Sequence, residues 1–147
     1  MKNEETKLNG RLIIAMSRSL QIIHQESEIL FRKNDLTMAQ FTVLEALYHK
    51  GDLTIGALIE SVLSTSGNMT VVVRNLEKLN LVERTDNPND KRSYIIKLTN
   101  QGKEMIQILY KEHMELVGNA LKSISYDDKE TVVTILKQLK NKGEKTL

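Results

Sequence analysis

Residues 53–98 contain the pattern that most restricts how this chain can fold. Two short stretches come first in which apolar residues repeat at helical spacing, and the small polar run 64–66 separates them. Two β-rich runs follow at 81–85 and 94–98. This order predicts two short helices joined by a turn, followed by a β-hairpin.

The hairpin connection and the second of these helices have the features of a binding surface. Residues 86–92 are rich in turn formers and exceed what a tight hairpin needs, so we expect this loop to project as a wing. On the helix expected over 65–79, the face opposite the apolar stripe has no carboxylate. It consists of Gly67, Asn68, Val71, Arg74, Asn75 and Lys78. A solvated helix face normally mixes both signs of charge. A helix-turn-helix with a wing is one way of presenting a helix to a DNA groove.

The composition limits the class of protein. A chain of 147 residues can build one domain with a real core. The absence of cysteine excludes disulfides, thiolate metal sites and thiol chemistry. The net charge is only +2, and residues 64–103 carry seven Lys and Arg against four acids, a local net charge of +3. There is no signal peptide and no apolar run long enough to span a bilayer, so we expect a cytoplasmic protein without a membrane partner.

A long helix is predicted over residues 8–31. Apolar residues recur there at helical spacing, with Ser27 as the only gap in register. A helix of this length cannot bury its apolar stripe on so small a domain by itself. It therefore needs a partner, either from within the chain or from a second copy.

Hydroxyl side chains that can cap a helix mark the starts of the remaining helices outside the 65–79 segment. They are Thr37, Thr54, Thr99 and Ser125. Thr65 or its neighbour can cap the helix expected over 65–79. Gly51 should end the helix that Thr37 begins, because glycine enters the left-handed conformation without penalty. Leu53 is expected to make a single strand-like pairing. We therefore expect a mostly α fold with a small β-hairpin wing, in which long N- and C-terminal helices flank a winged helix-turn-helix lobe.

The wing and its flanking strands resemble one known family. The string LEKLNLVERTDNPNDKRSYIIKLTNQG, with LTMAQFTVLEAL before it, resembles the MarR family of bacterial winged-helix transcription regulators. The most specific part is a D-x-R pair, Asp90 and Arg92, followed by a β-strand and the L-T-x-x-G motif of Leu98, Thr99 and Gly102. The resemblance covers essentially the whole chain.

The resemblance implies a homodimer whose two winged lobes bind a pseudo-palindromic operator in double-stranded DNA. It implies one MarR-type domain over 1–147, with a DNA-binding lobe at 33–99 and dimerisation helices at 8–32 and 100–141. The protein would then be a ligand-responsive regulator, a repressor by first expectation, with an effector pocket between the dimer helices and the lobe. A phenolic or other amphipathic compound is the effector that the family suggests, and no cofactor is expected.

Several residues are candidates for direct contact with DNA. They are Ser66, Asn68, Thr70, Val71, Arg74, Arg84, Lys91 and Arg92. The resemblance places Arg92 in the minor groove, where a planar guanidinium can lie along the groove. Asp90 can orient that side chain or tie down the turn, and it is expected to stabilise the wing. Arg84 is expected to contact the DNA backbone or to stabilise the wing.

Each assignment has a plainer alternative. Asp90 and Arg92 could form only a surface ion pair. The hydroxyls of Ser66 and Thr70 could cap the helix or bond back to its backbone. Val71 stands where the family often has arginine, which reduces the capacity of this helix to read guanine.

Two other classes of function compete with DNA binding. A winged-helix protein–protein module, in which Arg74 and Arg92 dock an acidic partner, is the main alternative; it would show neither steep salt dependence nor a preferred DNA sequence. An enzyme is not expected, because no catalytic constellation or phosphate loop is present. No metal site is expected either, because His24, His49 and His113 are widely spaced and none has a second His or a Cys nearby.

Overall fold

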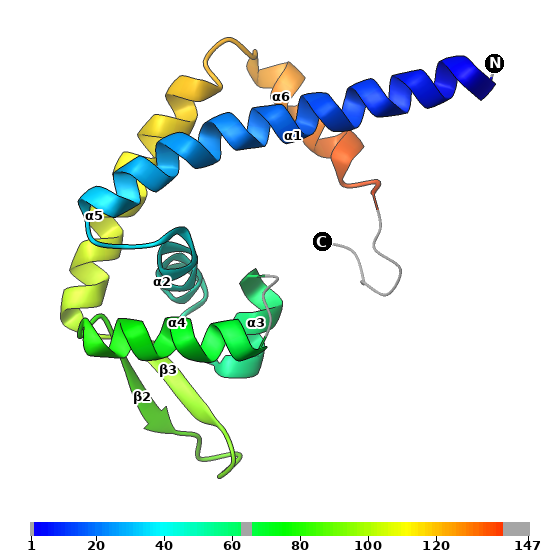
Figure 1. The fold of residues 1–147 in the computed structure, drawn as a ribbon. Coiled ribbons are helices and arrows are strands. Elements are labelled where there is room, and N and C mark those ends of the chain that lie inside the picture. The colour runs from blue at the N-terminus through cyan, green and yellow to red at the C-terminus, as the bar shows by residue number, and fades with distance from the viewer. Residues whose placement is uncertain (1, 63–65, 140–147) are drawn as a thin grey trace.

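The computed structural model describes residues 2–62 and 66–139. The fold is mostly helical with a small antiparallel sheet, as predicted, and Figure 1 shows its arrangement. In chain order the elements are α1 (Lys2–Lys33), α2 (Met38–Lys50), β1 (Leu53–Thr54), α3 (Ile55–Val62), α4 (Ser66–Lys78), β2 (Val82–Asp86), β3 (Tyr94–Leu98), α5 (Asn100–Ala120) and α6 (Tyr126–Leu136). Within the two described ranges, no helix combines the length and apolar character needed to cross a membrane.

The elements fall into two groups in space. α2, α3, α4 and the sheet form a lobe from which the β2–β3 hairpin projects, and α1 and α6 lie on the side away from the hairpin (Figure 1). α5 runs along the lobe from the base of the hairpin to that side (Figure 1). α5 begins directly after β3 and packs against both α2 and α1. It therefore links the base of the hairpin to the long N-terminal helix.

The sheet has three strands in the order β1-β3-β2, and all pairings are antiparallel. The predicted pairing of Leu53 is confirmed, since Leu53 lies opposite Ile96 and Thr54 lies opposite Ile95. β2 starts at Val82, one residue later than predicted, and Val82 pairs with Leu98. β1 therefore anchors the hairpin to the lobe on the side opposite β2.

The predicted caps form at the helix starts. The Thr37 hydroxyl accepts a hydrogen bond from the Gln40 amide at 3.2 Å, and the Gln40 side chain accepts one from the Thr37 amide at 2.8 Å. This reciprocal capping box satisfies two backbone donors at once. Three further hydroxyls accept from the backbone amide three residues on, and they belong to Thr54, Thr99 and Ser125. The prediction that Thr65 or a neighbour caps α4 lies outside the described residues.

The core lies between α2, α4, the sheet and the first half of α5. Its buried apolar side chains are Phe31, Leu36, Phe41, Val43, Leu44, Leu47, Leu58, Met69, Val72, Val73, Leu76, Leu81, Val82, Ile96, Leu98, Ile106 and Leu109. Helical periodicity places Tyr48 and Leu79 on the apolar faces of α2 and of the helix expected over 65–79, yet Tyr48 is 40% exposed and Leu79 is 41% exposed. Tyr48 lies near the end of α2 beside the rings of His49 and Tyr110, and Leu79 lies beyond the last residue of α4.

The long N-terminal helix differs from its prediction in extent. α1 begins at Lys2 instead of residue 8, because Glu4 and Glu5 in its first turn suit a helix N-terminus and no proline interrupts it. Only its last turns join the core, through Ser27 and Phe31. Leu12, Ile13 and Leu20 remain 53–59% exposed. The helix therefore presents an apolar surface that the single chain does not cover.

Candidate nucleic-acid interface

α4 divides its residues between the core and the outside. Met69, Val73 and Leu76 are buried, with at most 1% of their surface exposed. On the opposite side Val71 is 52% exposed. The other predicted contact residues of this helix whose side chains are described, Asn68, Thr70 and Arg74, are exposed as well. Ser66 is the first residue of α4. The apolar stripe therefore fixes the rotation of the helix and turns the acid-free face outward.

A network of side chains holds the wing tip, which we define as residues 87–93. Asn87 is central to it: its side-chain amide donates to the Ser93 hydroxyl at 2.9 Å, and its side-chain oxygen accepts from the Asn89 amide at 3.0 Å. The Asp90 carboxylate accepts from the backbone amide of Arg92 at 3.0 Å. The bonds from the Asn89 and Arg92 amides are turn-forming bonds of the Asx type. The long loop is thus built as a defined turn.

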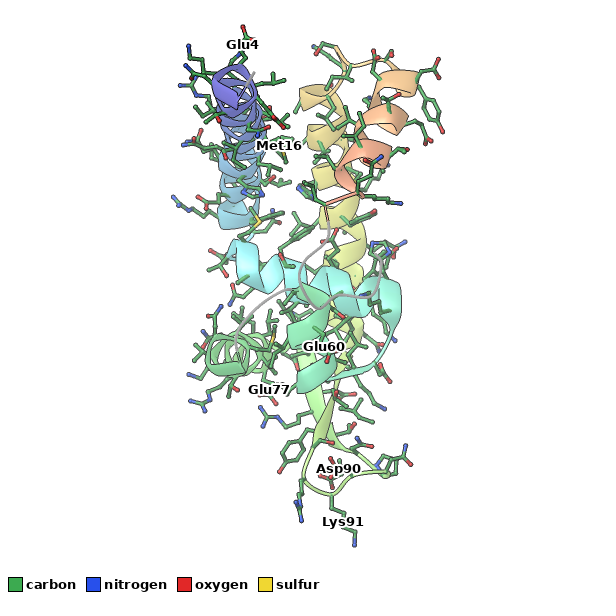
Figure 2. The ribbon with its side chains drawn as sticks, turned by 90° about the vertical axis from the view of Figure 1, so that its right-hand side faces the viewer. Glu4, Met16, Glu60, Glu77, Asp90 and Lys91 are labelled. Carbon is green, nitrogen blue, oxygen red and sulfur yellow. The ribbon has the colours of Figure 1, made fainter. Side chains whose placement is uncertain are left out.

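Asp90 bonds to the backbone of the turn and not to the side chain of Arg92. Of the two roles considered for Asp90, the geometry therefore favours tying down the turn. Among the described residues, no ion pair joins its carboxylate to the Arg92 guanidinium. Lys91 and Arg92 are both exposed, and Figure 2 shows Asp90 and Lys91 at the far end of the hairpin. Two positive charges therefore stand at the point of the molecule that projects furthest from the lobe.

The Arg84 side chain interacts with two other side chains of the protein, Glu77 and Tyr94. Its guanidinium forms an ion pair with the carboxylate of Glu77 at 2.9 Å and lies over the ring of Tyr94, 5.1 Å from the ring centroid. Glu77 belongs to the last turn of α4, and Figure 2 shows it on that helix. Arg84 was predicted as one of the DNA-contacting residues. The structure places its side chain between the helix and the hairpin, a position that suits wing stabilisation, the other role expected for this residue.

The base of the wing is locked to the start of α5. Asn80 adopts a left-handed conformation with φ 56°, which its short polar side chain tolerates. Its carbonyl accepts a 2.7 Å hydrogen bond from the Thr99 hydroxyl. Gly102 packs so closely here that a Cβ would lie 2.9 Å from the carbonyl carbon of Leu81. The L-T-x-x-G motif thus has a structural reason, because Thr99 caps α5 and Gly102 allows the close approach.

A polar contact in the core was missed by sequence reasoning. Ser27, treated as a gap in the stripe of α1, is only 1% exposed, and its hydroxyl lies 3.0 Å from Nε2 of His113 on α5. The His113 ring packs against Phe31 and Phe41, with centroids 5.2 and 4.9 Å away. Burial lowers the pKa of the His113 imidazole. Only the size and polarity of Ser27 within an apolar stripe could have signalled this contact.

Two further titratable residues, Glu45 and His49, lie near each other on α2. Burial raises the pKa of the Glu45 carboxyl on α2, and the neighbouring His49 opposes that shift. The His49 and Tyr110 rings meet edge to face at 4.7 Å. Across residues 2–62 and 66–139, no group of three or more His, Asp or Glu side chains is arranged to hold a metal ion.

Comparisons with known proteins agree on one family. Residues 36–94 match the MarR family. The HTH-type transcriptional regulator MhqR of Bacillus subtilis (strain 168) is 28% identical over 134 residues, which cover 91% of this chain and 92% of MhqR.

Comparisons with solved structures indicate the same family. Wild-type MarR from E. coli in its apo form is 28% identical with a TM-score of 0.72, over 88% of this chain and 93% of MarR. A mutant of the same E. coli protein, complexed with operator DNA, is 27% identical with a TM-score of 0.73, over 86% of this chain and 94% of that chain. These relatives are transcription regulators and not enzymes.

Proposed function

We propose that this chain, which matches the MarR family of winged-helix transcription regulators over residues 36–94, is a DNA-binding regulator of that type. We propose further that it acts as a ligand-responsive homodimeric repressor of a pseudo-palindromic operator. In this proposal each lobe, residues 33–99, puts α4 in a major groove and the wing tip in the adjacent minor groove. The two-fold symmetry of the dimer would space the half-sites by about one helical turn of DNA.

One observation carries the DNA-binding part of the proposal. The outward face of α4, with Val71 and Arg74, and the wing tip, with Lys91 and Arg92, are exposed while the scaffold beneath each is fixed by packing or hydrogen bonds. A rigid helix face and a cationic projection beyond it suit a groove and its flanking phosphates. Arg92 would enter the minor groove, and Lys91 would contact a phosphate.

The terminal helices support the dimer. Leu8, Leu12, Ile13 and Leu20 of α1 are each more than half exposed, and Val133, Ile135 and Leu139 at the C-terminal end are 51–68% exposed. A soluble protein rarely leaves so continuous an apolar surface uncovered. We propose that residues 8–32 and 100–141 of two copies cover each other.

A hollow beside α5 supports a small-molecule effector. It has a volume of about 420 Å³ and is lined by Leu47, Tyr48, Gly51, Asp52, Leu98, Lys103 and Gln107. This size falls in the range of ligand pockets, and its mixture of apolar walls and polar groups suits an amphipathic compound such as a phenol. An effector would change DNA affinity only through its preference between two arrangements of the lobes.

Selection of bound sequences from a random duplex library tests the proposal, followed by a salt titration on the selected site. We expect a two-fold symmetric site. Affinity should fall about a thousand-fold between roughly 50 and 200 mM salt, as about six or more phosphate contacts require. If no sequence is enriched and salt has little effect, the wing arginine serves an acidic protein partner and the proposal is wrong.

A further inference from the structure

We propose that Glu77, Arg84 and Tyr94 form a clamp that sets the position of the wing relative to α4, so that Arg84 supports DNA binding without contacting DNA. The inference rests on the proposed DNA-binding function and concerns how the two reading elements are held together. The clamp joins three elements, because Glu77 lies on α4, Arg84 on β2 and Tyr94 on β3.

The register of the hairpin explains why Arg84 turns toward the protein. Arg84 lies directly opposite Ile96, and Val82 lies opposite Leu98. Residues opposite each other in an antiparallel pair place their side chains on the same face of the sheet. Val82, Ile96 and Leu98 are buried, with 0–9% of their surface exposed, so Arg84 continues the face that packs on the core.

Tyr94 and Glu77 complete the clamp at the point where the apolar core ends. Tyr94 is two residues before Ile96 on β3, so it shares the core face and supports the Arg84 guanidinium from the hairpin side. Glu77 reaches the same guanidinium from α4 at 2.9 Å. The side chains of Arg84 and Glu77 are 32% and 29% exposed, so solvent screens the pair only partly.

The wing needs such a tie because a two-stranded hairpin beyond the core has little stability of its own. The Asn80 turn, which joins α4 to β2, fixes the hairpin at its base. On the opposite edge, β1 pairs with β3. The clamp adds a tie to α4 on the β2 edge, further along the strand than the Asn80 turn, and thereby fixes the direction in which Lys91 and Arg92 are presented.

Replacement of Glu77 tests the clamp most sharply, because charge alone predicts the opposite result. Glu77→Gln removes a negative charge from a helix that faces DNA, so long-range electrostatics predicts tighter binding. A clamp predicts weaker binding to the selected operator, by about five- to tenfold, because partners within one network are strongly coupled. Glu83→Gln is the matched control, since Glu83 is the exposed carboxylate next to Arg84 and makes no ion pair among the described residues. It should leave affinity unchanged or improve it slightly.

A double-mutant cycle separates positioning from contact. If Arg84 acts through Glu77, the variant that combines Glu77→Gln with Arg84→Gln should bind no more weakly than either single variant. The slope of affinity against salt should also stay that of the wild type. If Arg84 contacts a phosphate, Arg84→Gln should lower the salt slope by about one and its effect should add to that of Glu77→Gln. If the two single variants lose DNA affinity additively and Arg84→Gln has a lower salt slope, Arg84 contacts DNA directly and the clamp proposal is wrong.

Hydrogen exchange of the protein without DNA tests the clamp independently of whether the protein binds DNA. Amide hydrogen exchange in β2 and β3 should speed up in Glu77→Gln and not in Glu83→Gln, because the hairpin has lost the tie between β2 and α4. Unchanged exchange in the Glu77→Gln hairpin would refute the clamp. Failure of the wild-type protein to select any DNA sequence would instead refute the proposed function.

Discussion

The Ser27 hydroxyl and Nε2 of His113 lie 3.0 Å apart and join α1 to α5 across 86 positions of the sequence. The Ser27 hydroxyl donates its own hydrogen to the Ile23 carbonyl at 2.7 Å, so it can only accept from the histidine. His113 must therefore carry its proton on Nε2. Nδ1 is left as an acceptor, and it is the single buried side-chain nitrogen or oxygen in the described residues that lacks a hydrogen-bond partner.

This arrangement predicts that acid destabilises the protein through His113. Burial lowers the pKa of His113 in the folded state below its ordinary value of 6.5, so the unfolded chain takes up a proton first as the pH falls. The free energy of unfolding should therefore decrease from about pH 6.5 downward, until the pH reaches the folded-state pKa. Urea denaturation at a series of pH values measures this loss.

Two histidine variants separate the contribution of His113 to the pH dependence of unfolding from that of the other titratable groups. His113→Gln should flatten the pH dependence of unfolding in that window, whereas His24→Gln, at an exposed position of α1, should not. Glu45 acts in the opposite sense, because its raised pKa makes the folded state lose stability as the pH rises above 4.5. Its contribution is common to all the variants, so it cancels in the comparison. If the free energy of unfolding changes with pH equally in His113→Gln and in the wild type, His113 is not the cause of the acid destabilisation.

Arg92→Ala should weaken operator binding strongly, by about ten- to a hundredfold, because a guanidinium in a narrow minor groove interacts with focused negative potential. Fluorescence anisotropy with labelled operator measures the loss. Lys122→Ala removes the same charge at an exposed residue beyond the end of α5, far from the wing, and should have little effect. Equal losses in the two variants would mean that only net charge matters.

Gly102→Ala should destabilise the fold by ~2–3 kcal/mol. Gly102 lies in the first turn of α5, and the added methyl group would collide there with the carbonyl group of Leu81. Gly118 provides a control on the same helix, since a Cβ there meets nothing within 4 Å. Gly118→Ala should stabilise the protein slightly, by about 0.5–1 kcal/mol. Thermal unfolding of both variants measures the contrast, and equal midpoints would contradict the steric explanation.

Ile13→Glu should dissociate the proposed dimer, because it places a charge on the exposed apolar surface of α1. Sedimentation velocity should show a species of half the wild-type mass with unchanged helical content. A substitution is cleaner than deletion of residues 1–32, since the deletion would also remove Phe31 from the core. Arg18→Glu, at an exposed polar position of the same helix, is the control and should sediment with the mass of the wild type. A dimeric Ile13→Glu protein would contradict the proposed interface on α1.

Local patterns in the sequence predicted most of the fold. Thr37 and Thr99 cap the helices that they were expected to cap, and the Pro-containing turn after β2 forms the expected wing, because these signals act within a few residues. The D-x-R pair and the L-T-x-x-G motif then indicated the same family that residues 36–94 match.

Long-range pairings could not be predicted in the same way. Ser27 was interpreted as a gap in a stripe, and Arg84 was expected to contact the DNA backbone or to stabilise the wing, with no partner named for either. Their partners, His113 and Glu77, come from other elements, so the pairings depend on how those elements pack. Whether a polar side chain faces solvent or a neighbouring element is decided by tertiary contacts, which a periodic pattern does not contain.

The junction at Thr99 has a mechanical consequence. Thr99 follows the last residue of β3 and caps α5, so the wing continues into a 21-residue helix without a flexible linker. A helix of that length spans about 30 Å, and a tilt of about 5° at one end moves the other end by about 3 Å, close to the rise of one base pair. In the proposed dimer, small angular errors where the two copies meet would thus become whole base-pair steps at the proposed operator. Such a dimer would tolerate an angular error of only a few degrees.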